Sequence, residues 1–203
     1  MSLQPISYAA PERAPYHHGA LHQALLGAAE AELAETGLEA FSLRRVAKRA
    51  GVSHAAPAHH FGDAGGLLTA LAAEGFRQFI AAMDAQEALA ASDPRSRMIA
   101  AGLGYIGFAA HRPALFRLIF SSDRPDFDAP ELAAESSRAY RHLTALVTAM
   151  TGQDDPHDVL AVWAMAHGLA DLMAAGRLQA MESLAPAERD RAFADILARS
   201  IPG

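Results

Sequence analysis

Alanine is the most abundant residue of this 203-residue chain, and it recurs in almost every segment. It loses no side-chain entropy in a helix, whereas the β-branched residues that favour strands do. Valine, isoleucine, threonine and tyrosine are all sparse. Hydrophobic residues make up 51% of the chain, enough to bury a substantial core rather than remain disordered. The composition therefore predicts an all-α fold, without strands and without an internal repeat.

Apolar residues at helical spacing, bounded by capping residues, predict about nine helices. Ser or Asp precedes several of them, often with Pro in the first turn, and Gly37 and Gly51 follow two of them. Residues 1–16 contain three prolines and are expected to form a flexible arm, and a polar loop is expected at 121–130. The expected helices span about 19–37, 43–50, 53–60, 63–90, 93–111, 113–119, 129–150, 155–181 and 186–200.

Several classes of protein are disfavoured by what the sequence lacks. There is no cysteine, so we expect neither a disulfide framework nor a thiolate metal site. The first residues, MSLQPISYAAPERAPY, do not have the basic start and apolar run of a signal peptide. No apolar stretch is long enough to cross a bilayer. These features predict a soluble, cytoplasmic protein.

Charge is distributed unevenly along the chain, whose net charge is −6. Residues 1–60 carry five basic and five acidic side chains, whereas residues 61–203 carry twelve and eighteen. Within 42–60 there are four basic residues and no acidic one: Arg44, Arg45, Lys48 and Arg49. A small basic region on an acidic body is typical of a DNA-binding head joined to a partner domain. A solvated basic helix face would give the same pattern.

The segment FSLRRVAKRAGVSHAAPAHHF, residues 41–61, has the pattern of a helix-turn-helix. Ala47 is small enough for a second helix to cross closely, and Gly51 permits the positive φ of a tight turn. Such an arrangement leaves one face of the second helix free to enter a major groove. The helix starts at Ser42 and Ser53 suit phosphate, and Arg44 is long enough to reach a guanine edge. An ordinary helical hairpin with a basic face remains the alternative interpretation.

Residues 17–76 resemble the TetR family of repressors. The resemblance rests on five ordered features: the Gly after the first helix, the S-L-R start of the second, A-K-R-A-G-V-S, the His-Phe that ends the third, and a leucine-rich start of the fourth. It implies a head at 17–62, a helical ligand-binding and dimerisation domain at 63–203, and a dimer that binds double-stranded operator DNA. It also implies that Ser42, Ser53 and His60 contact phosphate and that Arg44 reads a base. The exposed face of the recognition helix would then consist of His54, Ala55, Ala56, Ala58 and His59.

Two positions depart from the family pattern. Ala58 stands where the family usually has Tyr, and Ala64 stands where it usually has Lys, so each is a lost phosphate contact. Arg45 and Lys48, or His17 and His18 in the arm, are expected to compensate. The departures also keep an alternative open, namely a helical module that binds small molecules or proteins and whose DNA affinity is weak or lost.

The C-terminal part resembles a TetR-type domain named after its Trp, His and Gly. The resemblance rests on VWAMAHGLADLM, 162–173, and on HRPALFRLIF, 111–120. Trp163 and His167 lie on one helical face. One interpretation places both in the core or a dimer interface, with the histidine hydrogen-bonded. The other places them in a pocket for a hydrophobic or aromatic effector, in which His111, Arg117 or His167 orients a polar group. The pocket residues would then be Phe108, His111, Phe116, Arg117, Ile119, Phe120, Trp163, Met165 and His167.

The last two long helices carry apolar stripes that suit a four-helix interface between two subunits. Dimerisation also follows from the mechanism, because two heads must reach successive major grooves. We find no catalytic acid–base constellation, no phosphate-binding glycine loop and no cofactor motif, so an enzyme is not expected. No metal site is expected either, since the pairs His17-His18 and His59-His60 point apart, and His167 with Asp171 is better explained as a hydrogen-bonded pair. The sequence therefore predicts a ligand-responsive repressor that an effector releases from DNA.

Overall fold

The computed structural model describes residues 18–200, and these form ten helices and no strand. The all-α prediction is therefore confirmed. The helices are α1 (His18–Thr36), α2 (Leu43–Ala50), α3 (Ala56–Phe61), α4 (Ala64–Glu87), α5 (Pro94–His111), α6 (Pro113–Phe120), α7 (Pro130–Thr151), α8 (Pro156–Ala174), α9 (Gln179–Glu182) and α10 (Pro186–Ser200). The expected arm lies outside the described residues.

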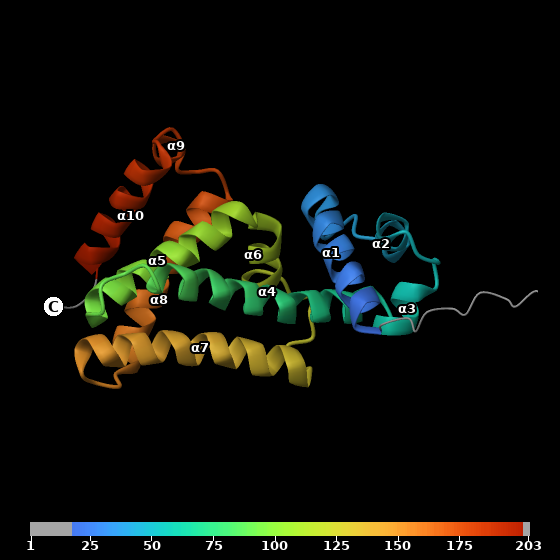
Figure 1. Cartoon of the computed structure of the whole chain (residues 1–203), viewed down its shortest axis with the longest axis horizontal. Helices are drawn as coiled ribbons and strands as arrows, with labels where there is room; N and C mark the ends of the chain where they lie inside the picture. Colours follow the sequence, from blue (N-terminus) through green and yellow to red (C-terminus); the bar gives the residue numbers. More distant parts are fainter. Residues whose placement is uncertain (1–17, 201–203) are drawn as a thin grey trace, which may run out of the picture.

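The molecule is elongated, with α1, α2 and α3 at one end and the other helices at the other (Figure 1). We call α1–α3 the head and α5–α10 the body. Helix α4 runs from beneath the head along the body, where α5 and α7 lie on either side of it (Figure 1). One hydrophobic cluster runs through both parts, from Leu33 and Val46 in the head through Leu67 and Leu71 of α4 to Phe116. The head and the body therefore share a core.

Three helix starts have the aspartate caps that the sequence predicts. The side chains of Asp63, Asp93 and Asp155 accept hydrogen bonds from backbone N–H groups of the first turn of α4, α5 and α8, at 2.8, 2.9 and 2.8 Å. Ser42 stands at the cap position of α2, but its side chain makes no capping hydrogen bond. Acidic N-caps are thus the device that starts three of the longest helices.

The sequence prediction was wrong at three helix boundaries, and the helix expected to reach residue 90 ends at Glu87. The helix expected to reach residue 181 ends at Ala174, because Gly176 takes a left-handed φ of 64° and the N–H of Arg177 turns back to the carbonyl oxygen of Leu172. A separate short helix, α9, follows. Helix α3 begins at Ala56 rather than after Ser53, since Pro57 occupies its first turn and residues 53–55 form the preceding turn.

Helices α4 and α5 approach each other closely at Gly104. A β-carbon added at this glycine would lie 2.5 Å from the carbonyl oxygen of Ala82 and 2.7 Å from Cα of Met83. Both atoms belong to the α4 backbone, so only glycine permits this spacing. No helix of residues 18–200 is long and apolar enough to span a membrane.

Candidate DNA-binding surface and ligand cavity

The turn between α2 and α3 has the tight geometry that the Ala47–Gly51 spacing predicts. Gly51 has a φ of 68°, and its N–H donates to the carbonyl oxygen of Lys48 at 3.2 Å. The N–H of Val52 donates to the carbonyl oxygen of Ala47 at 3.0 Å. Val46 and Ala47 are fully buried. These contacts fix where α3 lies relative to α2.

Helix α3 presents one side to solvent and buries the other. Pro57 is buried, and the ring of Phe61 lies 4.9 Å from the ring of His22 on α1. Ala56 and His60 are half-buried. The exposed residues of α3 and of the turn before it are Ser53, His54, Ala55, Ala58 and His59. Phe61 and Pro57 therefore hold the short helix α3 against the rest of the head, and its outer side stays exposed for contact with double-stranded DNA.

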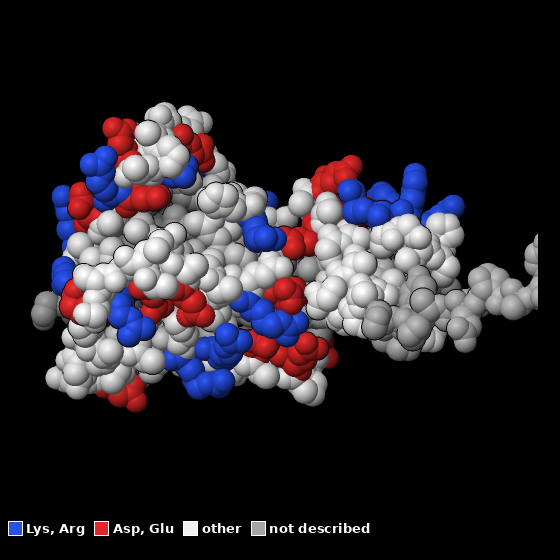
Figure 2. All heavy atoms as spheres, viewed as in Figure 1, with Lys and Arg blue, Asp and Glu red and all other residues white. Residues whose placement is uncertain are grey.

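Lysine and arginine side chains gather along one edge of the head, over α2 (Figure 2). Arg44 and Lys48 are exposed there, and within residues 18–200 neither has an acidic partner. Arg45 and Arg49 differ, because both form ion pairs with Glu32 of α1, and Arg49 also pairs with Glu35. Arg44 and Lys48 are thus the free cations of α2, whereas Arg45 and Arg49 hold α2 against α1.

Glu32 is the buried centre of that ion-pair cluster, with 1% of its surface exposed. Burial alone would raise the pKa of this carboxyl, but the hydrogen bonds and charges of Arg45 and Arg49 outweigh it and hold the pKa below its usual range. Thr36 also donates to Glu32 Oε1 at 3.4 Å. The carboxylate therefore stays charged and holds Arg45 and Arg49 of α2 against α1.

The two departures from the family pattern lie beside this surface. Ala58 is exposed on α3, and Ala64 is half-buried in the first turn of α4. Neither side chain can donate a hydrogen bond to phosphate. Of the histidines expected to compensate, His17 lies outside the described residues, as does the side chain of His18.

The body contains a cavity of about 400 Å³ between α4, α5, α7 and α8, with the end of α6 and the loop after it. Its wall is largely aromatic and aliphatic, and it contains no Asp, Glu, Lys or Arg. His142 is the one imidazole in the wall. The aromatic lining residues are Phe76, Phe79, Tyr105, Phe120, Phe127, Tyr140 and Trp163. Such a cavity suits an uncharged, mainly apolar molecule of drug-like size.

Four of the nine residues expected in the pocket line this cavity: Ile119, Phe120, Trp163 and Met165. The other five lie elsewhere. Phe108 and Phe116 are packed in the core, and Phe116 is fully buried. His111 is exposed, and its Nδ1 pairs with the carbonyl oxygen of Gly107 at 2.7 Å. Arg117 donates to the carbonyl oxygen of Ala174 at 2.6 Å and so caps the end of α8.

The fifth of these residues, His167, reaches the cavity only through Tyr105. Tyr105 Oη lies 2.8 Å from His167 Nδ1, and Trp163 Nε1 donates to the same oxygen at 3.3 Å. Burial lowers the pKa of His167 against a smaller opposing effect of Asp171, and burial raises the pKa of the Tyr105 phenol. Both groups are therefore neutral near pH 7, and the imidazole tautomer sets which of them donates the hydrogen bond between Oη and Nδ1. The phenol oxygen is thus held between His167 and Trp163.

Sequence reasoning missed the cavity walls that α4 and α7 supply, among them Phe76, Phe79, Tyr140 and His142. It also missed Tyr105, although a lone tyrosine within the apolar run of α5 signals a buried hydroxyl that needs a partner. The α4 and α7 residues carry no comparable signal. Their periodicity fits a core-facing stripe equally well.

Two family models match the chain. The family described as "Bacterial regulatory proteins, tetR family" matches residues 25–71, which cover most of the head and the start of α4. The family described as "Tetracyclin repressor-like, C-terminal domain" matches residues 98–199, which cover most of the body. The first match ends within α4, and the second begins within α5.

Relatives and solved structures agree with these matches. The HTH-type transcriptional regulator BetI of Paraburkholderia phytofirmans is 30% identical over 173 residues, which cover 70% of this chain and 88% of that protein. A Rhodococcus sp. RHA1 protein of unknown function is 32% identical, with a TM-score of 0.76 over 94% of this chain and 100% of that one. A TetR family transcription regulator from Marinobacter aquaeolei VT8 has the same fold, with a TM-score of 0.70 at 22% identity over 90% of this chain and 96% of its own. The chain belongs to the TetR family of transcriptional regulators.

Proposed function

We propose that this regulator is a repressor that binds a palindromic operator as a dimer and is released by an uncharged apolar or aromatic molecule in the body cavity. The observation that carries the proposal is the course of α4. Its first turn follows α3 directly, whereas Phe76, Phe79 and Met83, farther along the same helix, line the cavity. A molecule in the cavity therefore contacts the helix on which the DNA-binding head is mounted.

The effector acts by preferring one arrangement of the heads. A ligand shifts a conformational equilibrium only by its differential affinity for the two states. Because α4 contacts both α3 and the cavity, a small displacement of α4 would alter the separation of the two recognition helices. Heads that no longer reach successive major grooves lose operator affinity.

An exposed apolar face of α8 supports the dimer. Leu160, Met165 and Leu172 expose 60%, 37% and 39% of their surface, and Ala161, Ala164 and Gly168 between them are also exposed. Small and apolar residues along one side of a helix permit close packing against a second copy. Pairing across α8 would cover this face. We also propose that the regulator acts in the cytoplasm, where operator DNA is available.

The uncharged nature of the effector follows from the wall of the cavity. A buried carboxylate ligand would need a cationic or multiple hydrogen-bonding partner, and the wall contains no Lys or Arg. The polar side chains in the wall are Ser122, Ser136, Tyr105, Tyr140, His142 and Trp163. A neutral molecule with an aromatic or aliphatic body and few hydrogen-bonding groups would suit this site.

The test begins with operator selection: purified protein is mixed with genomic fragments, and the bound fragments are sequenced. Binding to the recovered site is then measured at several salt concentrations for the wild type and for Arg44→Ala, with Arg141→Ala as the matched control. Arg141 is exposed on α7, far from the head along the chain. We expect Arg44→Ala alone to weaken binding and broaden the sequence preference. Equal affinity and sequence preference in the wild type and Arg44→Ala would refute the assignment of Arg44 to operator recognition.

Ala58 and Ala64 favour a second candidate, a ligand-binding module whose DNA affinity is weak or lost. The two candidates differ in what operator selection recovers. Enrichment of a palindromic sequence, with light scattering that gives the mass of a dimer, supports the repressor. Recovery of random fragments, together with ligand-dependent stabilisation of the body, supports the second candidate.

A cavity-filling pair tests the effector site. Ala139 of α7 lines the cavity, whereas Ala134 on the same helix is exposed. Ala139→Leu is expected to abolish thermal stabilisation by apolar compounds found in a melting screen and to retain operator binding. Ala134→Leu is expected to retain both. Unchanged ligand response in Ala139→Leu would place the effector elsewhere.

A further inference from the structure

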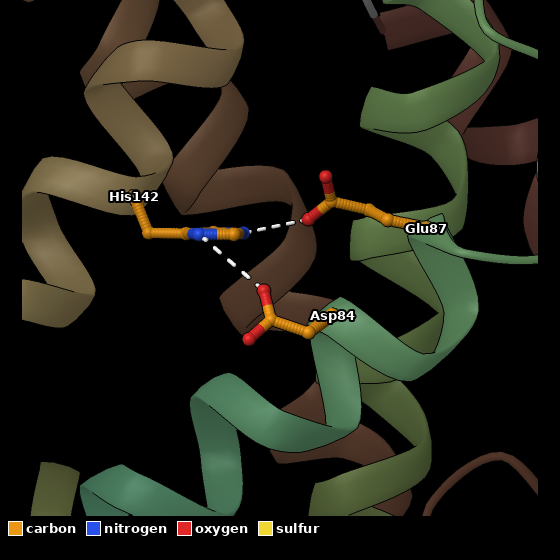
Figure 3. A group of neighbouring side chains, drawn as sticks. All are labelled: Asp84, Glu87 and His142. Carbon is orange, nitrogen blue, oxygen red and sulfur yellow. Dashed lines mark hydrogen bonds and ion pairs between the residues drawn. The ribbon is translucent and has the colours of Figure 1, made fainter.

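Asp84, Glu87 and His142 come together where the last turn of α4 meets α7. His142 Nε2 lies 2.6 Å from Glu87 Oε1, and His142 Nδ1 lies 3.7 Å from Asp84 Oδ1. One potential ligand atom from each of the three side chains lies within 4.8 Å of the other two. Figure 3 shows the imidazole of His142 reaching from α7 towards the two carboxylates, which project from successive turns of α4.

The three side chains differ in their exposure in a way that suits a bound ion. The Glu87 side chain is 6% exposed, and its second oxygen, Oε2, accepts from Arg97 of α5 at 2.8 Å. That ion pair orients the carboxylate and leaves Oε1 directed at His142. His142 is 20% exposed and Asp84 is 54% exposed, so the site is open to solvent on the Asp84 side. The ion pair with Arg97 thus fixes the Glu87 carboxylate, and the exposed Asp84 side leaves room for an ion to enter.

We propose that Asp84, Glu87 and His142 form a site for a divalent transition-metal ion such as Zn²⁺ or Co²⁺. One imidazole nitrogen and two carboxylate oxygens are the ligands that such ions bind at about 2.0–2.2 Å. Three protein ligands leave a coordination position for water, which the exposed side of the site can supply. The outer hydrogen bond from Arg97 to Glu87 is of the kind that orients ligating carboxylates in metal sites.

Charge favours a cation at this place. Two carboxylates face one guanidinium, so these three groups together carry a net negative charge. The cluster also lies at the C-terminal end of α4, where the helix dipole favours positive charge. A metal ion binds the lone pair of one imidazole nitrogen, and the single proton of the neutral imidazole then resides on the other nitrogen. The alternative is a purely structural network in which His142 links the two carboxylates without an ion.

Metal binding separates the two interpretations, because a structural network has no need of an ion. The full-length chain, made without a histidine tag and with His17 and His18 changed to alanine, is stripped of metal and titrated with Co²⁺ and then Zn²⁺. We expect one equivalent to bind, with a Co²⁺ absorption spectrum typical of nitrogen and oxygen ligands. His142→Ala and Asp84→Asn should each raise the dissociation constant at least tenfold. The matched control is His157→Ala, since His157 pairs with Asp155 alone, at 2.9 Å.

Thermal melting provides a second readout that depends neither on DNA nor on an effector. Zn²⁺ should raise the melting temperature of the parent chain and of His157→Ala, because the ion binds the folded state and links α4 to α7. The exposed residue Asp84 gives the cleaner variant, since Asp84→Asn removes a ligand while the buried ion pair of Glu87 stays in place. Absence of a bound equivalent, or equal Zn²⁺ affinity in Asp84→Asn and the parent, would overturn the proposal.

Discussion

The close approach of α4 and α5 gives opposite predictions for two glycines on the same helix. Gly104 and Gly107 lie one turn apart on α5, and both have ordinary helical backbone angles. A β-carbon at Gly107 would meet nothing within 4 Å, whereas one at Gly104 would lie 2.5 Å from the carbonyl oxygen of Ala82. The same substitution, glycine to alanine, should therefore stabilise the protein at one position and destabilise it at the other.

The magnitudes follow from these distances. Replacing glycine by alanine within a helix stabilises by about 0.5–1 kcal/mol, which is the expected gain for Gly107→Ala. A carbon–oxygen contact is normally about 3.3–3.6 Å, so Gly104→Ala must move the two backbones apart by about 0.8 Å. Such overpacking costs about 1–3 kcal/mol, and the helix-propensity gain offsets only part of it. The free energy of unfolding should thus fall by about 1–2 kcal/mol.

Thermal unfolding at one fixed protein concentration measures both effects, since the melting temperature of an oligomer depends on concentration. For a chain of this length, Gly104→Ala should lower the melting temperature by about 2–8 °C, and Gly107→Ala should raise it by about 1–4 °C. Equal melting temperatures for the two variants would show that α4 and α5 do not approach as closely as described.

Three further predictions concern charged and titrating groups. Glu32→Gln should lower the free energy of unfolding by about 1–3 kcal/mol at pH 7 in denaturant melts. Because the folded pKa of Glu32 is lowered, its contribution to stability is complete above about pH 4.5 and is lost as the pH falls further. The unfolding free energies of the wild type and Glu32→Gln should therefore converge at acidic pH. Lys48→Ala should lower the slope of log affinity against log salt by about one and leave sequence preference unchanged, whereas Arg44→Ala should alter that preference. The pKa of His167 is lowered, so below about pH 6.5 the unfolded chain binds a proton that the folded chain does not. Stability should therefore fall between pH 7.5 and pH 5.5, and by less in His167→Asn; an identical pH dependence in the two proteins would contradict this.

Local signals in the sequence predicted most of the fold. The caps at Asp63, Asp93 and Asp155 act within one turn of their own helix, so the sequence contains all the information that places them. The break after Ala174 depends on Gly176, which an apolar pattern does not distinguish from an interior glycine. Pro57 delayed the start of α3 for an equally local reason.

The candidate sites were less predictable, because they depend on contacts between distant residues. Arg45 was expected to compensate for lost phosphate contacts, but its partner Glu32 lies thirteen positions earlier on α1. The cavity walls on α4 and α7 have the same apolar stripe as a solid core. His142 and Glu87 are 55 positions apart, and no spacing rule joins them. Trp163 and Phe120 were found because their neighbourhood resembled a known domain.

The shared core has a consequence for protein engineering. Helix α1 packs on both α4 and α6, and Glu30 on α1 forms an ion pair with Arg112 at the junction of α5 and α6. A chimera that joined residues 1–62 to an unrelated body would lose the contacts of α1 with α4 and α6. Chimeric regulators with new operator preference are better made by exchanging only the outward residues of α3, so that Val46, Leu67 and Leu71 keep their partners.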